Sequence, residues 1–136
     1  MSGSAVKTVT PEQLHGLVGS IVGVNAQCVA LVRHLAQLPH TSFWRRGRRA
    51  RWGHLAHGTP IATFDADGRY ENATDGRSHA AIFVSENEMG LLVFDQWAGR
   101  PAQFRTLAFR GDAVKPAADN GDAFFEIVVA EAEDAA

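Results

Sequence analysis

The sequence predicts an α+β fold in which short helices come first and an antiparallel β-sheet follows. The first forty residues carry helix-start signals and one apolar stripe of helical period, whereas the later part carries short apolar runs bounded by turn-forming residues. With 136 residues, 46% of them hydrophobic, the chain is long enough for one core and short for two. We therefore predict a single domain over residues 10–129, after a flexible N-terminus (1–9) and before an acidic C-terminal tail (130–136).

Two helices are predicted before residue 40. Residues 10–13 (Thr-Pro-Glu-Gln) combine an N-cap, a proline suited to the first helical position and the glutamine of a capping box, so a helix begins there and ends near Gly19. Asn25 is the predicted N-cap of a second helix over residues 26–37. An apolar stripe at helical spacing runs along it: Cys28, Leu31, Val32 and Leu35.

The rest of the chain predicts a long loop and then strands. The loop covers residues 39–58. Short apolar runs predict five strands, at residues 60–64, 80–84, 91–95, 104–109 and 123–129. A hairpin centred on Asn87 would place His79 opposite Asp95 on one face, whereas a one-residue slip would place Gln96 there instead.

Cys28 is the only cysteine in the sequence, so no internal disulfide and no cysteine-rich zinc site can form. In the first turn of its helix, the partial positive charge of the helix end favours a thiolate. His79 then offers a base, with Asp95 to orient its ring, which is the arrangement of nucleophilic catalysis. The alternative is structural, with Cys28 in the core, His79 before a strand and Asp95 at a strand end.

Composition argues against several classes of protein. A net charge of −2 predicts no general affinity for nucleic acid or for a membrane surface, and no apolar run approaches the ~20 residues of a membrane span. Residues 1–10 lack the apolar stretch of a secretory signal, so we expect synthesis in the cytoplasm and leave specialised export open. His54 and His57 lack a carboxylate at ligand spacing, so neither a metal nor a cofactor is predicted.

An arginine-rich stretch offers a different function. Residues 43–52 hold Phe43, Trp44, Trp52 and five arginines: Arg45, Arg46, Arg48, Arg49 and Arg51. Such a mixture can contact phosphates and stack on bases, so a non-catalytic binding module is one hypothesis. A solvated loop is another. If the protein is an enzyme, Phe43, Trp44 and Trp52 would form walls of a substrate groove, and the arginines would contact acidic groups of the peptide.

Residues 27–32 (Gln-Cys-Val-Ala-Leu-Val) resemble the Gln-Cys start of the catalytic helix in CHAP-type amidases. Residues 58–64, 79–84 (His-Ala-Ala-Ile-Phe-Val) and 93–97 (Val-Phe-Asp-Gln-Trp) follow in the same order. More closely, the sequence resembles the BPSL0067 family of small bacterial proteins, which belong with the CHAP and NlpC-like hydrolases. The similarity covers residues 20 to 110.

This resemblance implies a papain-like core, with the catalytic helix packed on an antiparallel sheet. It implies amide hydrolysis, commonly in peptidoglycan stem peptides, with Cys28 as nucleophile, His79 as base and Asp95 as the orienting residue. The Cys28 N–H with the side chain of Gln27 or Asn25 would bind the oxyanion, and Gln96 and Trp97 are expected beside the substrate.

Relatives of this kind include type VI toxins, for which a cognate immunity protein would be a partner. Deamidation of glutamine or asparagine in a partner protein uses the same chemistry and stays open.

Overall fold

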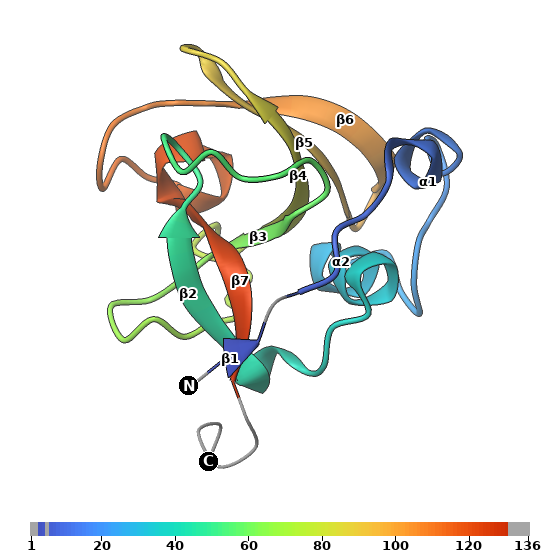
Figure 1. The fold of residues 1–136 in the computed structure, drawn as a ribbon, viewed down its shortest axis with the longest axis horizontal. Helices are drawn as coiled ribbons and strands as arrows, with labels where there is room; N and C mark the ends of the chain where they lie inside the picture. The colour runs from blue at the N-terminus through green and yellow to red at the C-terminus, as the bar shows by residue number, and fades with distance from the viewer. Residues whose placement is uncertain (1–2, 5, 131–136) are drawn as a thin grey trace.

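A seven-stranded antiparallel sheet forms most of the structure, and the longer helix α2 packs against two of its central strands, β4 and β5 (Figure 1). The computed structural model describes residues 3–4 and 6–130. The strands run in the order β1-β7-β3-β4-β5-β6, and β2 also pairs with β7. Their bounds are β1 Gly3–Ser4, β2 Trp44–Arg49, β3 Pro60–Thr63, β4 Ala80–Glu86, β5 Gly90–Trp97, β6 Arg100–Ala108 and β7 Phe124–Ala130. The helices are α1 Pro11–His15 and α2 Cys28–Ala36, with short 3-10 turns η1 Thr41–Phe43, η2 Ala117–Asp119 and η3 Gly121–Ala123. The α+β prediction is confirmed.

Both predicted helices are present, with shifted ends. Thr10 closes the predicted capping box with Gln13, but α1 stops at His15 and continues only as a turn toward Gly19. Helix α2 begins at Cys28 with Gln27 as its N-cap, because the Asn25 side chain instead accepts a hydrogen bond from the Gln27 N–H at 2.9 Å. The predicted cap at Asn25 is therefore wrong. Cys28 is the first helical residue rather than the third, and it remains in the first turn.

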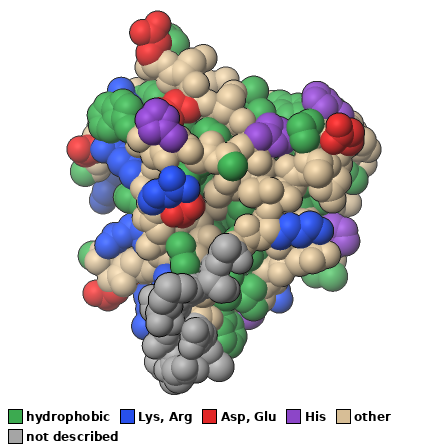
Figure 2. Space-filling model, viewed as in Figure 1, with side chains coloured by type: hydrophobic (Ala, Val, Ile, Leu, Met, Phe, Trp, Pro, Cys, Tyr) green, Lys and Arg blue, Asp and Glu red, His purple; other side chains and the backbone are tan. Residues whose placement is uncertain are grey.

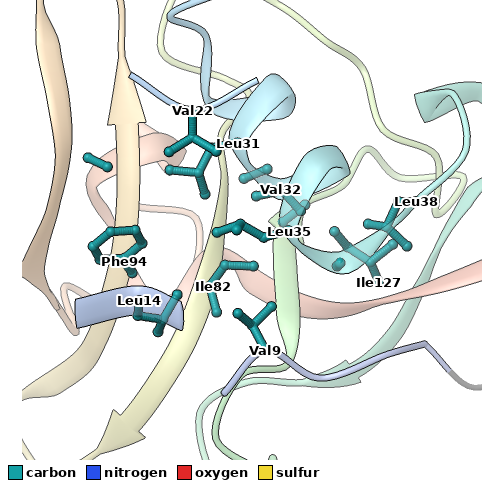
Figure 3. Close-up of a cluster of buried hydrophobic side chains, with 14 of the residues drawn as sticks. Val9, Leu14, Val22, Leu31, Val32, Leu35, Leu38, Ile82, Phe94 and Ile127 are labelled. Carbon is teal, nitrogen blue, oxygen red and sulfur yellow. The ribbon is translucent and has the colours of Figure 1, made fainter. Parts of the chain in front are cut away.

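The apolar stripe of α2 faces the sheet (Figure 3). Leu31, Val32 and Leu35 are buried beside Ile82 of β4 and Phe94 of β5. Burying side chains of this size stabilises a fold by about 1.5–3 kcal/mol each. Cys28 lies at the end of the same stripe and is only partly buried, so the packing that anchors α2 leaves the sulfur at the edge of the core.

The predicted loop over residues 39–58 contains strand β2, which pairs with β7. The buried Trp44 starts this strand, and Arg48 pairs with Glu126 of β7 at 3.1 Å. An arginine-rich strand of this kind lacks the apolar alternation on which strand prediction depends. The five predicted strands are present, and β5 and β6 begin earlier than expected.

The β4–β5 hairpin is shifted from the predicted register. Ile82 pairs with Phe94, whereas a hairpin centred on Asn87 would pair it with Leu92. Side chains alternate along a strand with a period of two, so a two-residue shift leaves His79 and Asp95 on the same face. The predicted direct opposition was wrong, and the predicted face was right.

The ends of the chain differ from the predicted boundaries. Strand β1 pairs with β7, and Val9 is buried with its N–H bonded to the Gly58 carbonyl, so residues 1–9 include ordered parts. Ala130 closes β7, and the rest of the predicted acidic tail, residues 131–136, lies outside the described residues. Within the described part of the chain, no helix has the length and apolar character needed to cross a membrane.

Candidate active site

A cavity of about 360 Å³ lies between the start of α2 and the segment that leads into β4. Cys28 and His79 both line it, and His79 is the residue just before β4. The other lining residues are mostly small or uncharged: Gln27, Val29, Tyr70, Asn72, Ala73, Thr74, Gly76, Ser78 and Trp97. A nucleophilic side chain and a titratable partner therefore meet in a pocket that solvent can enter.

Three groups lie near the Cys28 sulfur. His79, the backbone N–H of Ala80 and the hydroxyl of Tyr70 each lower the pKa of its thiol. Burial opposes ionisation and raises the pKa of the thiol, but the hydrogen bond and charge of His79, with those two donors, outweigh it. The pKa of Cys28 is lowered overall, which increases the fraction of reactive thiolate.

His79 is held between the sulfur and Asp95. Its Nε2 lies 2.7 Å from Asp95 Oδ2, and both side chains are buried. Because a carboxylate only accepts hydrogen bonds, Nε2 carries the proton and Nδ1 is left for the sulfur. Burial alone would lower the pKa of His79, but Asp95 and Cys28 together raise it to about 9. The ring also lies edge-on to Trp97 and Phe124, with centroids 6.2 Å away in each case.

The Asp95 carboxylate is fully buried and accepts from two arginines of β6 as well. Arg100 Nη1 donates to Oδ1 at 3.1 Å, and Arg105 Nε donates to Oδ2 at 2.8 Å. Burial raises the pKa of the Asp95 carboxyl, but His79 and Arg105 lower that pKa by more than burial raises it. The group is therefore ionised at neutral pH. An ionised carboxylate can orient the imidazole and stabilise its protonated form.

Residues 2–127 match the family described as Dae2, domesticated amidase effector 2. The chain belongs to the Dae2 family. It is 36% identical over 113 residues to the domesticated amidase effector 2 of Ixodes scapularis, a match covering 79% of this chain and 75% of that protein. It is 41% identical over 78 residues to a type VI secretion amidase effector 2 protein of Salmonella typhi, and that match covers 56% of each.

The fold of this Dae2-family chain is similar to a solved type 6 secretion amidase effector 2 (Tae2). The TM-score is 0.71 at 29% identity, covering 82% of this chain and 87% of the other. The comparisons thus show the Dae2 family, and the resemblance to the BPSL0067 family and to CHAP-type amidases stays a prediction.

Gln96 has a different place in the Dae2-family chain from the one predicted. It is buried and does not face His79: its Oε1 accepts from the Val22 N–H at 2.9 Å, and its Nε2 donates to the carbonyls of Val22 and Gln27 at 2.8 and 3.0 Å. These bonds tie the segment before α2 to strand β5. Gln96 therefore fixes the position of Cys28 without touching the cavity.

We expect Gln96→Ala to lower the free energy of unfolding by about 2–4 kcal/mol, because several buried backbone groups lose their partner. Urea unfolding followed by circular dichroism measures this. Gln103→Ala, at an exposed position of β6, is the matched control and should change stability by less than about 0.5 kcal/mol. Equal stability of the two variants would contradict this role of Gln96.

Tyr70 was missed by the sequence analysis. It lies in a polar, turn-rich segment with no strand or helix period, and only the folded structure brings its hydroxyl to the sulfur. Its ring packs on Trp44 with centroids 5.0 Å apart, and burial and the neighbouring sulfur raise the pKa of its hydroxyl. Tyr70 is thus a fixed, protonated donor beside the nucleophile.

The remaining predicted residues divide between the cavity and other places. Gln27 and Trp97 line the cavity, whereas the Asn25 side chain is used in the turn before α2. Trp44 is fully buried and supports Tyr70 from the core. Trp52 is 64% exposed and borders a separate hollow with Glu86. The prediction that these tryptophans are walls of the substrate groove is wrong for the Cys28 cavity, because β2 directs Trp44 inward and Trp52 lies beyond the end of that strand.

The arginine-rich stretch is largely engaged within the protein. Arg49 and Arg51 both pair with the buried Asp122, at 2.7 and 2.9 Å, and stack on Trp52. On the face shown in Figure 2, basic side chains alternate with acidic ones rather than forming one broad patch. These contacts give the arginines a structural role in joining β2 to the segment before β7.

His54 and His57 have no partners for a metal site in the described part of the chain, where no group of three or more metal-ligating side chains occurs.

Proposed function

We propose that this chain is a thiol-dependent amidase with a papain-like arrangement, in which Cys28 attacks an amide of a peptidoglycan stem peptide. One observation carries the proposal: the sulfur of Cys28, the imidazole of His79 and the carboxylate of Asp95 form a continuous chain that ends in an open cavity. Two relatives named as amidase effectors support the choice of an amide substrate.

The proposed reaction is acyl transfer. The Cys28 thiolate adds to the amide carbonyl, and the imidazolium of His79 gives its Nδ1 proton to the leaving amine. Neutral His79 then takes a proton from water as the water attacks the thioester. The second product leaves as a carboxylic acid, and the thiolate and imidazolium are restored. Asp95 keeps Nε2 protonated throughout and so holds the ring in the productive tautomer.

The negative oxygen of the tetrahedral intermediate needs donors close to the sulfur. The Cys28 N–H is one, because the first amides of a helix have no partner inside it. The Tyr70 hydroxyl, which lies near the sulfur, is a second. Gln27, on the cavity wall, is a third.

Tyr70→Phe tests this role because it removes the hydroxyl and keeps the ring that packs on Trp44. We expect kcat on a stem-peptide substrate to fall about a hundredfold with KM little changed, since the lost hydrogen bond is formed with the oxyanion. Thermal unfolding serves as the control for intact packing. An unchanged kcat would remove Tyr70 from the mechanism.

The proposed function is tested by incubating the protein with purified peptidoglycan fragments and identifying the products by mass spectrometry. Release of new amine ends, present with the wild type and absent with Cys28→Ala, is the expected result. Conversion of a side-chain amide to an acid with the backbone uncut would instead assign the protein as a deamidase. No change in any fragment would overturn the proposal.

The named relatives also suggest the setting. Since a relative is named as a type VI secretion effector, we propose export by a specialised system of that kind, with a cognate immunity protein as a partner that protects the producing cell.

A further inference from the structure

A buried cluster of charges lies behind the His79 ring. The Asp95 carboxylate accepts from His79, Arg100 and Arg105 at once, with distances of 2.7, 3.1 and 2.8 Å. Both guanidinium groups also stack on Trp97, at 4.4 and 4.8 Å from its ring centroid. One carboxylate thus faces three groups that can carry positive charge.

The surroundings of the imidazole are well defined on every side. Cys28 faces it from α2, the Tyr70 hydroxyl lies near the sulfur, and the uncharged rings of Trp97 and Phe124 border the imidazole. Asp95 faces it from β5, and Arg105 from β6. Beyond these, Arg100 acts through Asp95, and Asp119 lies 3.5 Å from Arg105 Nη1 at the exposed end of the guanidinium.

Arg105 does more than hold Asp95. Its Nη2 lies 3.3 Å from His79 Nε2, the nitrogen whose proton goes to Asp95. Because Nε2 carries the proton that it donates to Asp95, and because a guanidinium only donates, neither group accepts a hydrogen bond from the other. The contact therefore brings a fixed positive charge against the imidazolium, while the Arg105 Nε bond draws electron density from the oxygen that His79 uses.

We propose that Arg105 is a positioning residue that weakens the electrostatic attraction between Asp95 and the protonated His79 ring. Arg105 thereby sets how readily His79 loses its proton. The functional consequence rests on the proposed amidase reaction. An imidazolium that Asp95 stabilises too strongly is a weak acid toward the leaving amine. By weakening that attraction, Arg105 keeps His79 able to deliver its proton while Asp95 still fixes the ring.

The direction of the effect distinguishes this role from a purely structural one. If Arg105 only held Asp95 in place, its removal would free the carboxylate and make His79 lose its proton more easily. If it limits Asp95, removal makes His79 keep its proton to higher pH. The two roles predict shifts of opposite sign.

The test is an NMR titration of the His79 ring in the full chain, assigned by comparison with His79→Ala. Arg105→Gln should move the titration midpoint up by roughly 0.5–1 pH unit, and Asp95→Asn should move it down by at least as much. Arg105→Lys, which keeps the charge, should stay nearer the wild type than Arg105→Gln. Arg110→Gln, at an exposed position after β6, is the matched control and should leave the midpoint unchanged.

A midpoint that falls or does not move in Arg105→Gln would overturn the inference. Should that variant fail to fold, Arg100→Gln provides the second test: it should give a smaller upward shift, because Arg100 contacts the other oxygen of Asp95, and no upward shift would count against the inference. The titration needs no substrate. The shifts could therefore be found in a protein that leaves peptidoglycan intact, in which case the proposed function fails and the charge-limiting role stands.

Discussion

Replacement of Cys28 by alanine is expected to lower amide hydrolysis by at least about a thousandfold while leaving the fold intact. The sulfur is the attacking atom in the proposed reaction, and no other cysteine can take its place. Because Cys28 is only partly buried at the edge of the core, its loss should cost about 1 kcal/mol or less of stability. Release of amine ends from peptidoglycan fragments measures the activity, and thermal unfolding measures the stability.

Cys28→Ser is the companion variant, because a hydroxyl of similar size preserves the shape of the site. It should be almost as inactive as Cys28→Ala, since the environment that lowers the thiol pKa cannot ionise a serine hydroxyl at neutral pH. Near-normal turnover by either variant would show that Cys28 is not the nucleophile.

His79→Ala should lower activity by about 10²–10⁴-fold, because the thiolate loses its stabilising cation and the leaving amine loses its proton donor. His79 and Cys28 act as one unit, so the double variant should be no more than a few-fold below Cys28→Ala alone. Single-turnover kinetics on a stem peptide compares the three variants.

His34→Ala is the matched control for the histidine variant, since His34 lies exposed on α2 outside the cavity. It should retain wild-type rates. If the loss of activity in the double variant equalled the product of the two single-variant losses, Cys28 and His79 would contribute independently. That result would contradict the paired mechanism.

The local part of the fold could be predicted because short-range rules decide it. The α1 capping box and the apolar stripe of α2 each depend on residues only a few positions apart, and both are present. Strand β2 could not be predicted, because its arginines are stabilised by Glu126 and Asp122, which are far away in the sequence. The start of α2 differs from the prediction for a local reason, because the Asn25 side chain forms a turn with Gln27 instead of capping the helix.

In the candidate site, too, some features could be predicted from local sequence patterns and others depend on long-range contacts. The meeting of His79 and Asp95 followed from strand alternation, which tolerates the two-residue error in register. Tyr70, Arg100 and Arg105 were not foreseen as site residues. They lie in a turn-rich segment and on the partly exposed part of β6, and only the packing of the sheet brings them to Cys28 and Asp95. Gln96 was expected beside His79 or the substrate, but its side chain instead bonds to the segment before α2. These buried bonds are long-range contacts that the sequence pattern does not reveal.

The rate of Cys28 alkylation by iodoacetamide at pH 6, in the native protein and in His79→Ala, tests the paired thiolate most directly. With one cysteine in the chain, all of the product measured by mass spectrometry arises from Cys28. At this pH His79 is protonated and the thiol pKa is lowered, so the native protein should react faster than a free cysteine thiol, and His79→Ala should react far more slowly. A native protein that reacts no faster than the free thiol, or as slowly as the variant, would contradict the account.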